Sequence, residues 1–474
     1  MNTEKSFPPS VKSAVDMIKD ITGNTCELNC ACYYISGIEA AVVSEEGLAG
    51  ALVQNEMLAE AFAQAENHAP KNGEKLVDML FGSLLVSPDK TIVTLTDDAL
   101  IRLFSGYSLI IVDGSSRVIA FGTQMFGARS VSAPISDQTV YGSQEAFTEN
   151  VRVSISQVRR RLKTPDLRFE MLTAGGLSKT DVCIAYVKGR ADNSALSDVR
   201  KRINSIKLDT VLSGGYIRPY LEKGYTRTLF SPSRLTERPD TTAAALAEGK
   251  IAVLTDGTPF ALILPARFAE SFTTPDDMAG KPLYVSFIRW LKYLAFFLAT
   301  LFPGLYAAAV FEPESFAFKL LLNLYSAEES SQFPLGVEVI IITLLLEILR
   351  EAGIRLPKAV GSAVSIVGGL IIGDAAVKCG IISAPLLILV GLTATSSFVI
   401  PELSQQTSVM RIVFILAGTL AGMYGLACAL ILMLANICAV DELSVCYTAP
   451  LIPFDKKRFS AVLWQKQGDK AADN

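Results

Sequence analysis

The sequence predicts an α/β soluble N-terminal region of two small lobes, followed by an all-α transmembrane domain. Two observations support this fold class. Half of the 474 residues are hydrophobic, and a mean hydropathy of +0.37 is high for a soluble protein. The excess lies in residues 282–440, whereas residues 1–281 alternate strand and helix patterns at ordinary soluble composition.

Residues 1–25 are predicted to form a short helical N-terminal arm. Residues 1–20 mix charged residues, proline and serine and contain no apolar core, unlike a signal peptide. We therefore expect the soluble region to lie on the cytoplasmic side of the membrane.

The first lobe is predicted over residues 26–139. Alternation in CACYYISGIEAAVVS predicts a strand, a turn and a second strand, and residues 48–66 and 74–85 have helical patterns. Its clearest element is SLIIVDGSSRVIAFGT, in which two apolar strands flank Asp113-Gly114. An Asp-Gly pair in this setting is typical of a β-hairpin.

The second lobe is predicted over residues 167–281, with a strand at 181–187 and a helix at 194–206. It contains a similar hairpin, KIAVLTDGTPFALILP, around Asp256-Gly257. The recurrence suggests that the stretches 26–139 and 167–267 are related copies. Coincidence is the alternative, because Asp-Gly hairpins are common.

Residues 140–166, between the lobes, are predicted as an amphipathic linker helix, because apolar residues recur there at three- and four-residue steps. The helix ends in Arg159, Arg160 and Arg161. Basic side chains stabilise a helix C-terminus, and they also attract anionic lipid. Both interpretations stay open, so the three arginines are candidates for a membrane-facing or coupling role.

Several classes of function are disfavoured by composition and motifs. A net charge of −4 argues against a nucleic-acid binder. We find no phosphate loop, nucleophile elbow or metal-ligand spacing, and the single histidine, His68, lies in a polar run that predicts a surface loop. We therefore predict no enzyme, no catalytic residue, no cofactor and no metal. Cys26, Cys30 and Cys32 form a cluster that we interpret as reduced structural thiols, with a metal site as the alternative.

The transmembrane domain is predicted over residues 282–440, with four or five membrane helices, and a polar tail follows over 441–474. A helix needs about 20 apolar residues to cross the hydrocarbon core. The candidate segments are residues 283–310, 334–349, 359–377, 381–400 and 411–440. If both ends of the chain lie inside, the number of spans is even, and 334–349 is our choice for the segment that does not span.

Ionisable residues mark a candidate functional site in the segment 334–349 and just after it. Glu338 and Glu347 interrupt apolar sequence, and the segment ends in a charged cluster of Arg350, Glu351 and Arg355. Such groups cost several kcal/mol near the bilayer centre unless they are paired or hydrated, so they indicate a functional role.

Small residues form a stripe in the next segment. Gly361, Ser365, Gly369 and Gly373 recur at every fourth position. A stripe of this kind allows helices to pack closely within one subunit, and it also suits the narrow part of a pore surrounded by identical helices. Asp374 and Lys378 follow at a spacing that allows an ion pair.

A set of ordered motifs runs from about residue 141 to residue 453. They are GSQEAFTENVR, VRRRL, YVKG, GGYI, TERPD, DGTPF, EILREAGIRLP and AVSIVGGLIIG. With these motifs the chain resembles the A subunit of the GerA-type spore germinant receptors, a family that also includes the SpoVAF proteins. The last two motifs are the most specific, and so many ordered matches argue against accidental similarity.

The resemblance implies a multi-pass protein of the spore inner membrane, with its soluble region on the spore-core side. It implies a transporter-like B subunit and a lipoprotein C subunit as partners, and a ring of identical subunits whose helices form a ligand-gated ion channel that triggers germination. Acidic residues would favour cations, and an apolar constriction would form the gate. The hypothetical ion path comprises Glu338, Thr343, Glu347, Gly361, Val364, Ser365, Val367, Gly369 and Gly373, and the hypothetical coupling residues are Arg159, Arg160, Arg161, Arg350, Glu351 and Arg355.

Some positions depart from the pattern of the family. Thr343 stands where a glutamate is common, Asp374 and Lys378 replace neutral polar residues, and Ser213 stands where an aspartate often precedes GGYI. These departures leave open a SpoVAF-like accessory protein. The alternative function is a non-conducting structural or assembly subunit that docks a transporter-like partner, and a third is small-molecule sensing by the lobes.

Overall fold

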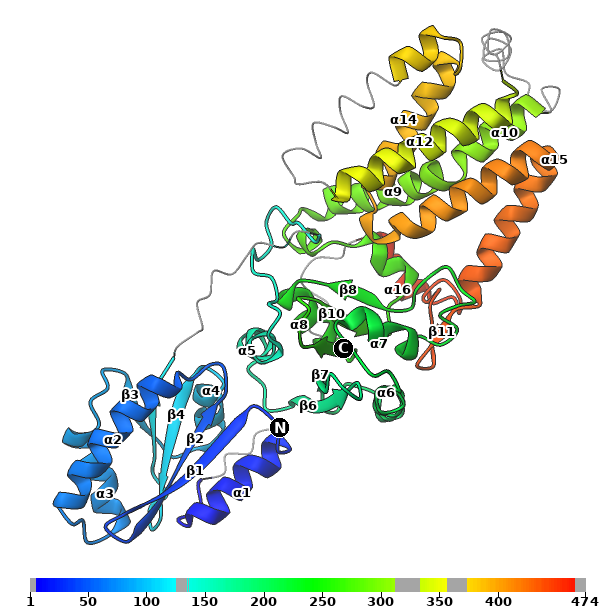
Figure 1. Cartoon of the computed structure of the whole chain (residues 1–474). Helices are drawn as coiled ribbons and strands as arrows, with labels where there is room; N and C mark the ends of the chain where they lie inside the picture. The colour runs from blue at the N-terminus through cyan, green and yellow to red at the C-terminus, as the bar shows by residue number, and fades with distance from the viewer. Residues whose placement is uncertain (1–5, 125–133, 135, 312–332, 356–372, 465–474) are drawn as a thin grey trace. The chain divides into compact units, whose positions relative to one another are not determined.

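The computed structural model of the chain describes residues 6–124, 134, 136–311, 333–355 and 373–464. It divides into two compact units (Figure 1). Unit 1 comprises Met1–Tyr225, Ser233–Ala266 and Glu442–Ser444, and unit 2 comprises Thr226–Pro232, Arg267–Asp441 and Val445–Asn474. Unit 1 is built from two α/β lobes and unit 2 is mainly helical, which confirms the predicted fold class.

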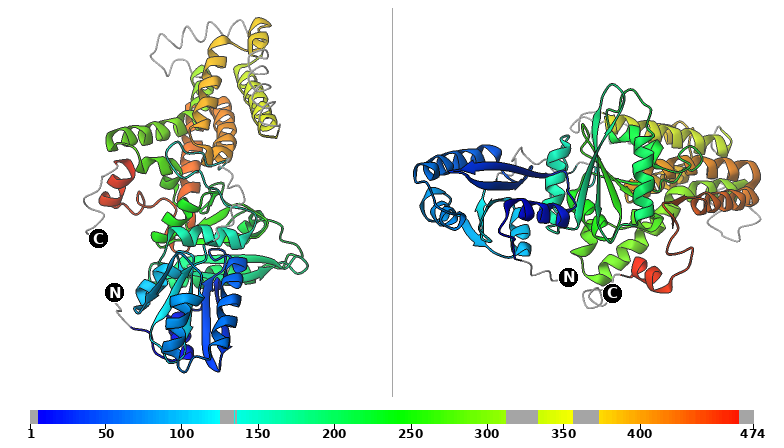
Figure 2. Two further views of the ribbon diagram at one scale, coloured as in Figure 1. Left: turned by 90° about the vertical axis from the view of Figure 1, so that its left-hand side faces the viewer. Right: turned by 90° about the horizontal axis from the view of Figure 1, so that it is seen from below.

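The first lobe of unit 1 is a five-stranded antiparallel sheet, within the described residues, with helices on both faces. Its elements in chain order are α1 (Val11–Thr22), β1 (Leu28–Ile35), β2 (Ile38–Glu45), α2 (Ala51–Asn67), α3 (Gly73–Met79), a π-helical turn (Leu80–Leu84), β3 (Lys90–Val93), α4 (Thr96–Leu103), β4 (Tyr107–Val112) and β5 (Val118–Gly122). The strand order is β1-β2-β4-β5-β3. Because successive residues of a strand point to opposite faces, the sheet forms one core with α1 and α4 and another with α2 and α3. The ribbons of Figure 2 show helices packed beside the strands of this lobe.

The second lobe repeats this arrangement element by element. In chain order it contains α5 (Val151–Arg161), β6 (Leu167–Ala174), β7 (Thr180–Val187), α6 (Asn193–Asn204), α7 (Gly214–Leu221), β8 (Arg234–Thr236), α8 (Pro239–Ala247), β9 (Ile251–Thr255) and β10 (Ala261–Leu264). Its strand order, β6-β7-β9-β10-β8, matches that of the first lobe position by position. The helices α5 and α8 cover one face, and α6 and α7 cover the other. The predicted hairpins around the two Asp-Gly pairs are β4–β5 and β9–β10, so the repeat is confirmed at the level of topology.

The repeat includes the first helix of each lobe. In the first lobe the carboxylate of Asp113 accepts a hydrogen bond from the backbone N–H of Val11, and the N–H of Gly114 donates to the carbonyl of Pro9. In the second lobe Asp256 accepts from the N–H of Val151, and Gly257 donates to Glu149 in the same way. The N-terminal arm and the linker helix are therefore equivalent elements. Each packs on a sheet rather than standing apart from the lobes.

The helix α5 is shorter than predicted. It begins at Val151 rather than near residue 141, because Asn150 caps it by accepting hydrogen bonds from the N–H groups of Arg152 and Val153. Its apolar side, Val151, Ile155 and Val158, is buried against the sheet of the second lobe. Burying each of these side chains stabilises the fold by about 1.5–3 kcal/mol. The predicted apolar face is therefore present, but the cap sets a later start for the helix.

Unit 2 consists mainly of helices, and all of them except the last are rich in apolar residues. They are α9 (Pro282–Thr300), α10 (Phe302–Phe311), α12 (Leu335–Arg355), α14 (Ala384–Phe398), α15 (Ser404–Cys438) and α16 (Lys456–Leu463), preceded by short 3-10 turns at Phe268–Phe272 and Pro275–Met278. The segment 283–310, predicted as one helix, forms the two helices α9 and α10. Pro303 has no N–H for the helical hydrogen bond to the residue four positions earlier, and its ring clashes with the preceding turn. Two stretches of the described chain, Pro282–Thr300 and Pro401–Cys438, are long and apolar enough to cross a bilayer.

The remaining predicted segments differ from the structure in length. The helix α12 has 21 residues and is about 30 Å long, and it extends to Arg355, beyond the end of the predicted segment 334–349. Conversely, α14 has 15 residues, fewer than the roughly 20 needed to span as predicted for residues 381–400. Most of the segment 359–377 lies outside the described residues.

Close helix contacts in unit 2 depend on glycine. A Cβ at Gly304 of α10 would lie 2.5 Å from the carbonyl oxygen of Phe414, and one at Gly418 of α15 would overlap the carbonyl oxygen of Gly304. Only glycine allows the two backbones to approach this closely. Farther along, Gly422 has a φ of 55°, a left-handed conformation that interrupts α15 and kinks the helix.

Candidate functional site

The helix α12 carries the predicted carboxylates, and it presents two different sides. Val337, Ile341, Leu344 and Ile348 are exposed and form an apolar stripe along the helix. Glu338, by contrast, is only 1% exposed, and it lies beside the buried Val339. In a single copy of the chain, this carboxylate is therefore turned into unit 2.

Thr343 is also turned inward. It is 4% exposed, and its hydroxyl has no hydrogen-bond partner among the described residues. Neighbouring Ile342 belongs to the apolar core that α12 shares with α14 and α15. Glu338 and Thr343 thus lie within one copy and not on an outer surface.

Glu347 lies in a charged cluster near the C-terminal end of α12. Its carboxylate is 27% exposed and forms an ion pair with Arg350, whose side chain is 20% exposed. Nη1 of Arg350 also donates to Oγ of Ser408 in α15 at 2.9 Å. The cluster therefore joins α12 to α15, and Glu347 is the described carboxylate of the ion-path set that reaches the surface of a single copy.

Arg411 of α15 belongs to the same region and was not among the predicted site residues. It is 4% exposed, and its Nε donates to the carbonyl oxygen of Ala299 in α9 at 2.9 Å. Its Nη2 and the Nε of Arg350 have no hydrogen-bond partner among the described residues. A lone arginine at the start of the apolar segment 411–440 is the signal that could have identified it.

Glu351 and Arg355 form an exposed ion pair with an Nη2–Oε1 distance of 2.7 Å. Their side chains are 54% and 78% exposed, so the pair contributes little to stability. The predicted pair of Lys378 and Asp374 is confirmed at 2.6 Å and is equally exposed to solvent. These charges are available for contacts with a partner or with lipid headgroups.

The small-residue stripe is described at one position. A Cβ at Gly373 would lie 3.3 Å from Cδ2 of Leu387 in α14, which is the contact expected of close packing within one copy. The other members of the predicted ion path in this segment lie outside the described residues; they are Gly361, Val364, Ser365, Val367 and Gly369.

The three consecutive arginines of α5 have different surroundings. Arg159 is completely buried between the lobes, where it forms an ion pair with Glu27 of the first lobe. Its other hydrogen bonds go to the carbonyl oxygens of Thr164 and Leu167, at 2.8 and 3.0 Å. Its Cζ lies 4.3 Å from the ring centroid of Phe104 and 5.1 Å from that of Phe169, which places it between one ring from each lobe. A lipid-facing role therefore does not fit Arg159, because its charge is already paired and enclosed.

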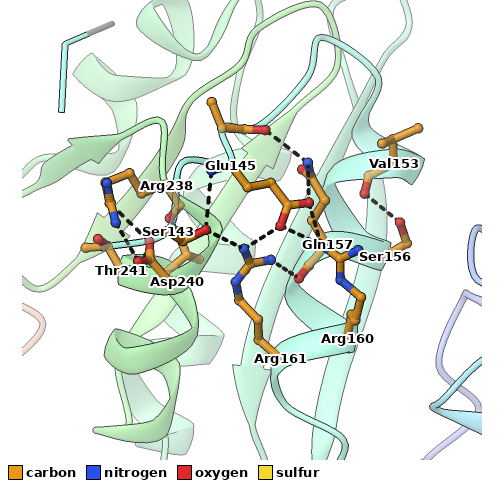
Figure 3. Close-up of polar contacts among 12 residues, drawn as sticks. Ser143, Glu145, Val153, Ser156, Gln157, Arg160, Arg161, Arg238, Asp240 and Thr241 are labelled. Carbon is orange, nitrogen blue, oxygen red and sulfur yellow. Dashed lines mark hydrogen bonds and ion pairs between the residues drawn. The ribbon is translucent and has the colours of Figure 1, made fainter. Parts of the chain in front are cut away.

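Arg160 and Arg161 both bind Glu145, in the extended segment that precedes α5 (Figure 3). Nη2 of Arg160 lies 2.6 Å from Oε1 of Glu145, and Arg161 also donates to Oγ of Ser143 at 3.2 Å. Gln157 completes the group by donating to the same carboxylate at 3.2 Å. The basic end of α5 thus holds the GSQEAFTENVR segment in place. This contact explains why the glutamate of GSQEAFTENVR occurs together with the arginines of VRRRL.

The TERPD motif contacts the same segment from the other side. The carboxylate of Glu237 accepts from the N–H of Ser136 at 2.8 Å, and its carbonyl oxygen accepts from the N–H of Phe147 at 2.7 Å. Arg238 is fully buried, and it donates to Asp240 at 2.6 Å (Figure 3). It also donates to the hydroxyl of Thr139 at 2.7 Å. The motifs TERPD and GSQEAFTENVR are far apart in the sequence but contact each other in the structure.

Two buried carboxylates of the first lobe were also missed by the sequence. Glu27 is 2% exposed and holds Arg159, and Glu45, at the end of β2, is 0% exposed. Glu27 directly precedes β1 and Glu45 ends β2, and at such positions the sequence alone does not distinguish a buried glutamate from a solvated one. Burial raises the pKa of Glu45 well above its ordinary value, and nearby Glu27 raises it further.

The cysteine cluster and the histidine take no part in a site of the described chain. His68 is exposed, and Cys26, Cys30 and Cys32 are free thiols. Among the residues that the structure describes, no group of three or more histidine, cysteine, aspartate or glutamate side chains is placed to hold a metal ion.

Comparisons with known proteins agree across most of the chain. A family model described as Bacillus/Clostridium GerA spore germination protein matches residues 10–472. Spore germination protein KA of Bacillus subtilis (strain 168) is 38% identical over 367 residues, which are 77% of this chain and 67% of that protein. Spore germination protein GerLA of Bacillus cereus is 32% identical over 359 residues, 75% of this chain and 73% of that protein. A crystal structure of the N-terminal domain of the A subunit of the Bacillus megaterium spore germinant receptor GerK3 covers 56% of this chain and 99% of that one, at 32% identity and a TM-score of 0.46.

Proposed function

The chain belongs to the GerA family of spore germination proteins, and on that premise we propose that it is a membrane subunit of a spore germinant receptor whose copies assemble into a cation channel. It would lie in the spore inner membrane as a multi-pass protein, with unit 1 on the spore-core side. Its partners would be a transporter-like B subunit and a lipoprotein C subunit.

The observation that carries the channel proposal is the charged cluster of α12. Glu347 lies in a helix of membrane length, is partly exposed and is paired with Arg350. A carboxylate kept in such a setting is costly, and it is retained where it contacts a polar route or a partner. A ring of such carboxylates would concentrate cations at the mouth of the route.

The apolar stripe of α12 supplies a surface through which copies could meet. Val337, Ile341, Leu344 and Ile348 are exposed in the single chain and lie on one side of the helix. Contact between copies along this stripe would bring the partly exposed Glu347 of each copy close to a common axis. The segment 359–372 would then line the narrow part of the route, with Val364 and Val367 as the apolar constriction.

Cation flux through liposomes that contain the full chain tests this proposal. We expect Glu347→Gln to lower the flux of a monovalent cation, because it removes one charge per copy from the mouth. Glu56→Gln is the matched control, because it removes the charge of an exposed carboxylate of α2 that belongs to neither the ion path nor the coupling residues, and we expect it to leave flux near the wild-type level. Val364→Ala should raise the flux by widening the constriction. Wild-type flux no greater than that of protein-free liposomes would contradict the channel.

A second candidate function is a non-conducting assembly subunit, or a SpoVAF-like accessory protein, that docks a transporter-like partner. The observation that favours it is the inward position of Glu338 and Thr343, which removes two polar groups from any route between copies. On this account the apolar stripe of α12 would bind the partner. Equal flux in wild type and in Glu347→Gln, together with a stable one-to-one complex with the partner, would favour this candidate.

A further inference from the structure

Glu45 is a fully buried carboxyl group for which the structure provides no hydrogen bond. It is the last residue of β2 and is 0% exposed. Neither of its side-chain oxygens has a hydrogen-bond partner among the described residues. An ionised carboxylate in such a place would lose its hydration without replacement, which is strongly unfavourable.

Glu45 forms no ion pair within the part of the chain that the structure describes, although the guanidinium of Arg159 lies nearby. The groups that face it are Glu27, Glu46, Cys26 and Arg159. Arg159 is already bound to Glu27 and to two carbonyl oxygens, and Glu46 is paired with Arg152 at 3.0 Å. The guanidinium of Arg168 is also buried, but it binds the carbonyl oxygens of Pro165 and Ile21 and is not among the groups that act on Glu45. Glu27 and Glu45 therefore compete for the guanidinium of Arg159, and the carboxyl group that does not bind it must be neutralised in another way. Burial and the nearby Glu27 raise the pKa of Glu45, so a proton is the neutralising species.

This cluster lies where the two lobes meet. Glu27 and Glu45 come from the first lobe, whereas Arg159 and Phe169 come from the second. Backbone hydrogen bonds cross the same contact, because the N–H of Cys26 donates to the carbonyl oxygen of Phe169 at 3.4 Å. Separation of the lobes would let water reach Glu45 and restore its ordinary acidity.

The repeat shows that the fold does not need a carboxyl group at this position. Glu45 pairs with Leu28 at the end of the β1–β2 ladder, and Val187 pairs with Leu167 at the equivalent end of β6–β7. An apolar residue therefore closes the same ladder in the second lobe. The carboxyl group at position 45 is an addition to the first lobe.

We propose that Glu45 is a proton-binding site that couples the docking of the two lobes to pH. Docking then takes up one proton at any pH between the ordinary pKa of glutamate and the raised pKa of Glu45 in the docked state. In that window the docking equilibrium constant falls about tenfold per pH unit as the pH rises, and outside it the constant does not change with pH. Acidification favours the docked lobes, and alkalinisation favours their separation.

Hydrogen exchange of the full chain in detergent measures this coupling. The backbone N–H groups of Cys26 and Phe169 report on the docked state, because both donate across the contact. The ratio of the exchange rate in wild type to that in Glu45→Gln, taken at one pH, cancels the intrinsic pH dependence of exchange. We expect this ratio to rise by up to about tenfold per pH unit inside the window, because docking of the wild type takes up a proton, whereas the side chain of the variant is neutral at every pH. A ratio that stays constant with pH would overturn the proposal.

The matched control is Glu56→Gln, which makes the same change at an exposed carboxylate of α2 in the same lobe, away from the contact between the lobes. We expect its exchange to follow the pH profile of the wild type. If Glu45→Gln does not fold, Glu45→Val replaces it, because valine closes the equivalent ladder in the second lobe. An exchange rate that depends on the sodium or potassium concentration instead of on pH would also overturn the proposal, since a metal cation would then neutralise Glu45.

Infrared spectroscopy of the full chain tests the protonation state directly. At neutral pH, we expect a carbonyl band of a protonated carboxyl group in the wild type that is lost in Glu45→Gln and kept in Glu56→Gln. The difference between variants is needed because other carboxyl groups of the chain, such as those of Glu338 and Glu442, are also buried. A band of equal intensity in wild type and Glu45→Gln would show that Glu45 is ionised, and it would overturn the proposal.

Discussion

Arg159 and Arg160 are neighbours in the chain, yet they occupy opposite environments. Arg159 is enclosed between the lobes with Glu27, whereas Arg160 is 36% exposed in its pair with Glu145. Consecutive residues of a helix point about 100° apart, so only one of them can face the first lobe. The sequence identified the basic cluster but could not decide which arginine is buried, because that depends on how the lobes dock.

This difference predicts unequal effects of substitution. Arg159→Met removes the charge that pairs with Glu27 and leaves a carboxylate buried alone, so we expect unit 1 to lose about 3–5 kcal/mol of stability. Arg160→Gln should cost no more than about 1 kcal/mol, because its pair is partly solvated. Denaturant unfolding of the full chain in detergent measures both. Equal losses in the two variants would contradict the buried position of Arg159.

At the scale of elements, the Asp-Gly hairpins were predictable because two adjacent residues determine the turn. The sequence did not reveal that each aspartate also reaches the start of the first helix of its lobe. These contacts join residues that are far apart in the chain, and local patterns carry no information about them. For the same reason the arm and the linker helix were not predicted as equivalent elements.

Replacing either aspartate should weaken its lobe by a similar amount. In Asp113→Ala and in Asp256→Ala, the N–H of the first helical residue loses its side-chain acceptor, so we expect a loss of roughly 1 kcal/mol in each case. Thermal unfolding measures the change. Asp78→Ala serves as a control, since its pair with Arg117 is largely exposed. No loss in one of the two aspartate variants would contradict their equivalence.

The contact between α10 and α15 gives a prediction at the same scale. Gly418→Ala would place a methyl group against the backbone of Gly304, so the helices must separate, which costs about 1–3 kcal/mol. Gly391→Ala is the matched control, because a Cβ at Gly391 in α14 meets nothing within 4 Å. Thermal stability of the full chain in detergent distinguishes them. If Gly391→Ala were as harmful as Gly418→Ala, the close contact would not explain the effect.

For the whole molecule, composition was sufficient to predict an α/β part followed by an apolar helical part. It was not sufficient to predict the lengths of the apolar helices. The break between α9 and α10 and the extension of α12 to Arg355 depend on one proline and on ion pairs at the helix end. The candidate carboxylates were found because charge is conspicuous in apolar sequence. The inward position of Glu338 could not be predicted, because both sides of α12 are rich in apolar residues.

The number of chains in the detergent-solubilised protein tests the central claim most directly, because a channel of this design requires several copies around one axis. We expect native mass spectrometry of the full chain to show assemblies of several copies. Ile348→Arg should break these assemblies, because it places a charge in the exposed apolar stripe of α12. Ile388→Arg, at a similarly exposed position of α14, should leave them intact. A wild-type protein that remains a single, folded copy at membrane-like concentrations would contradict the account.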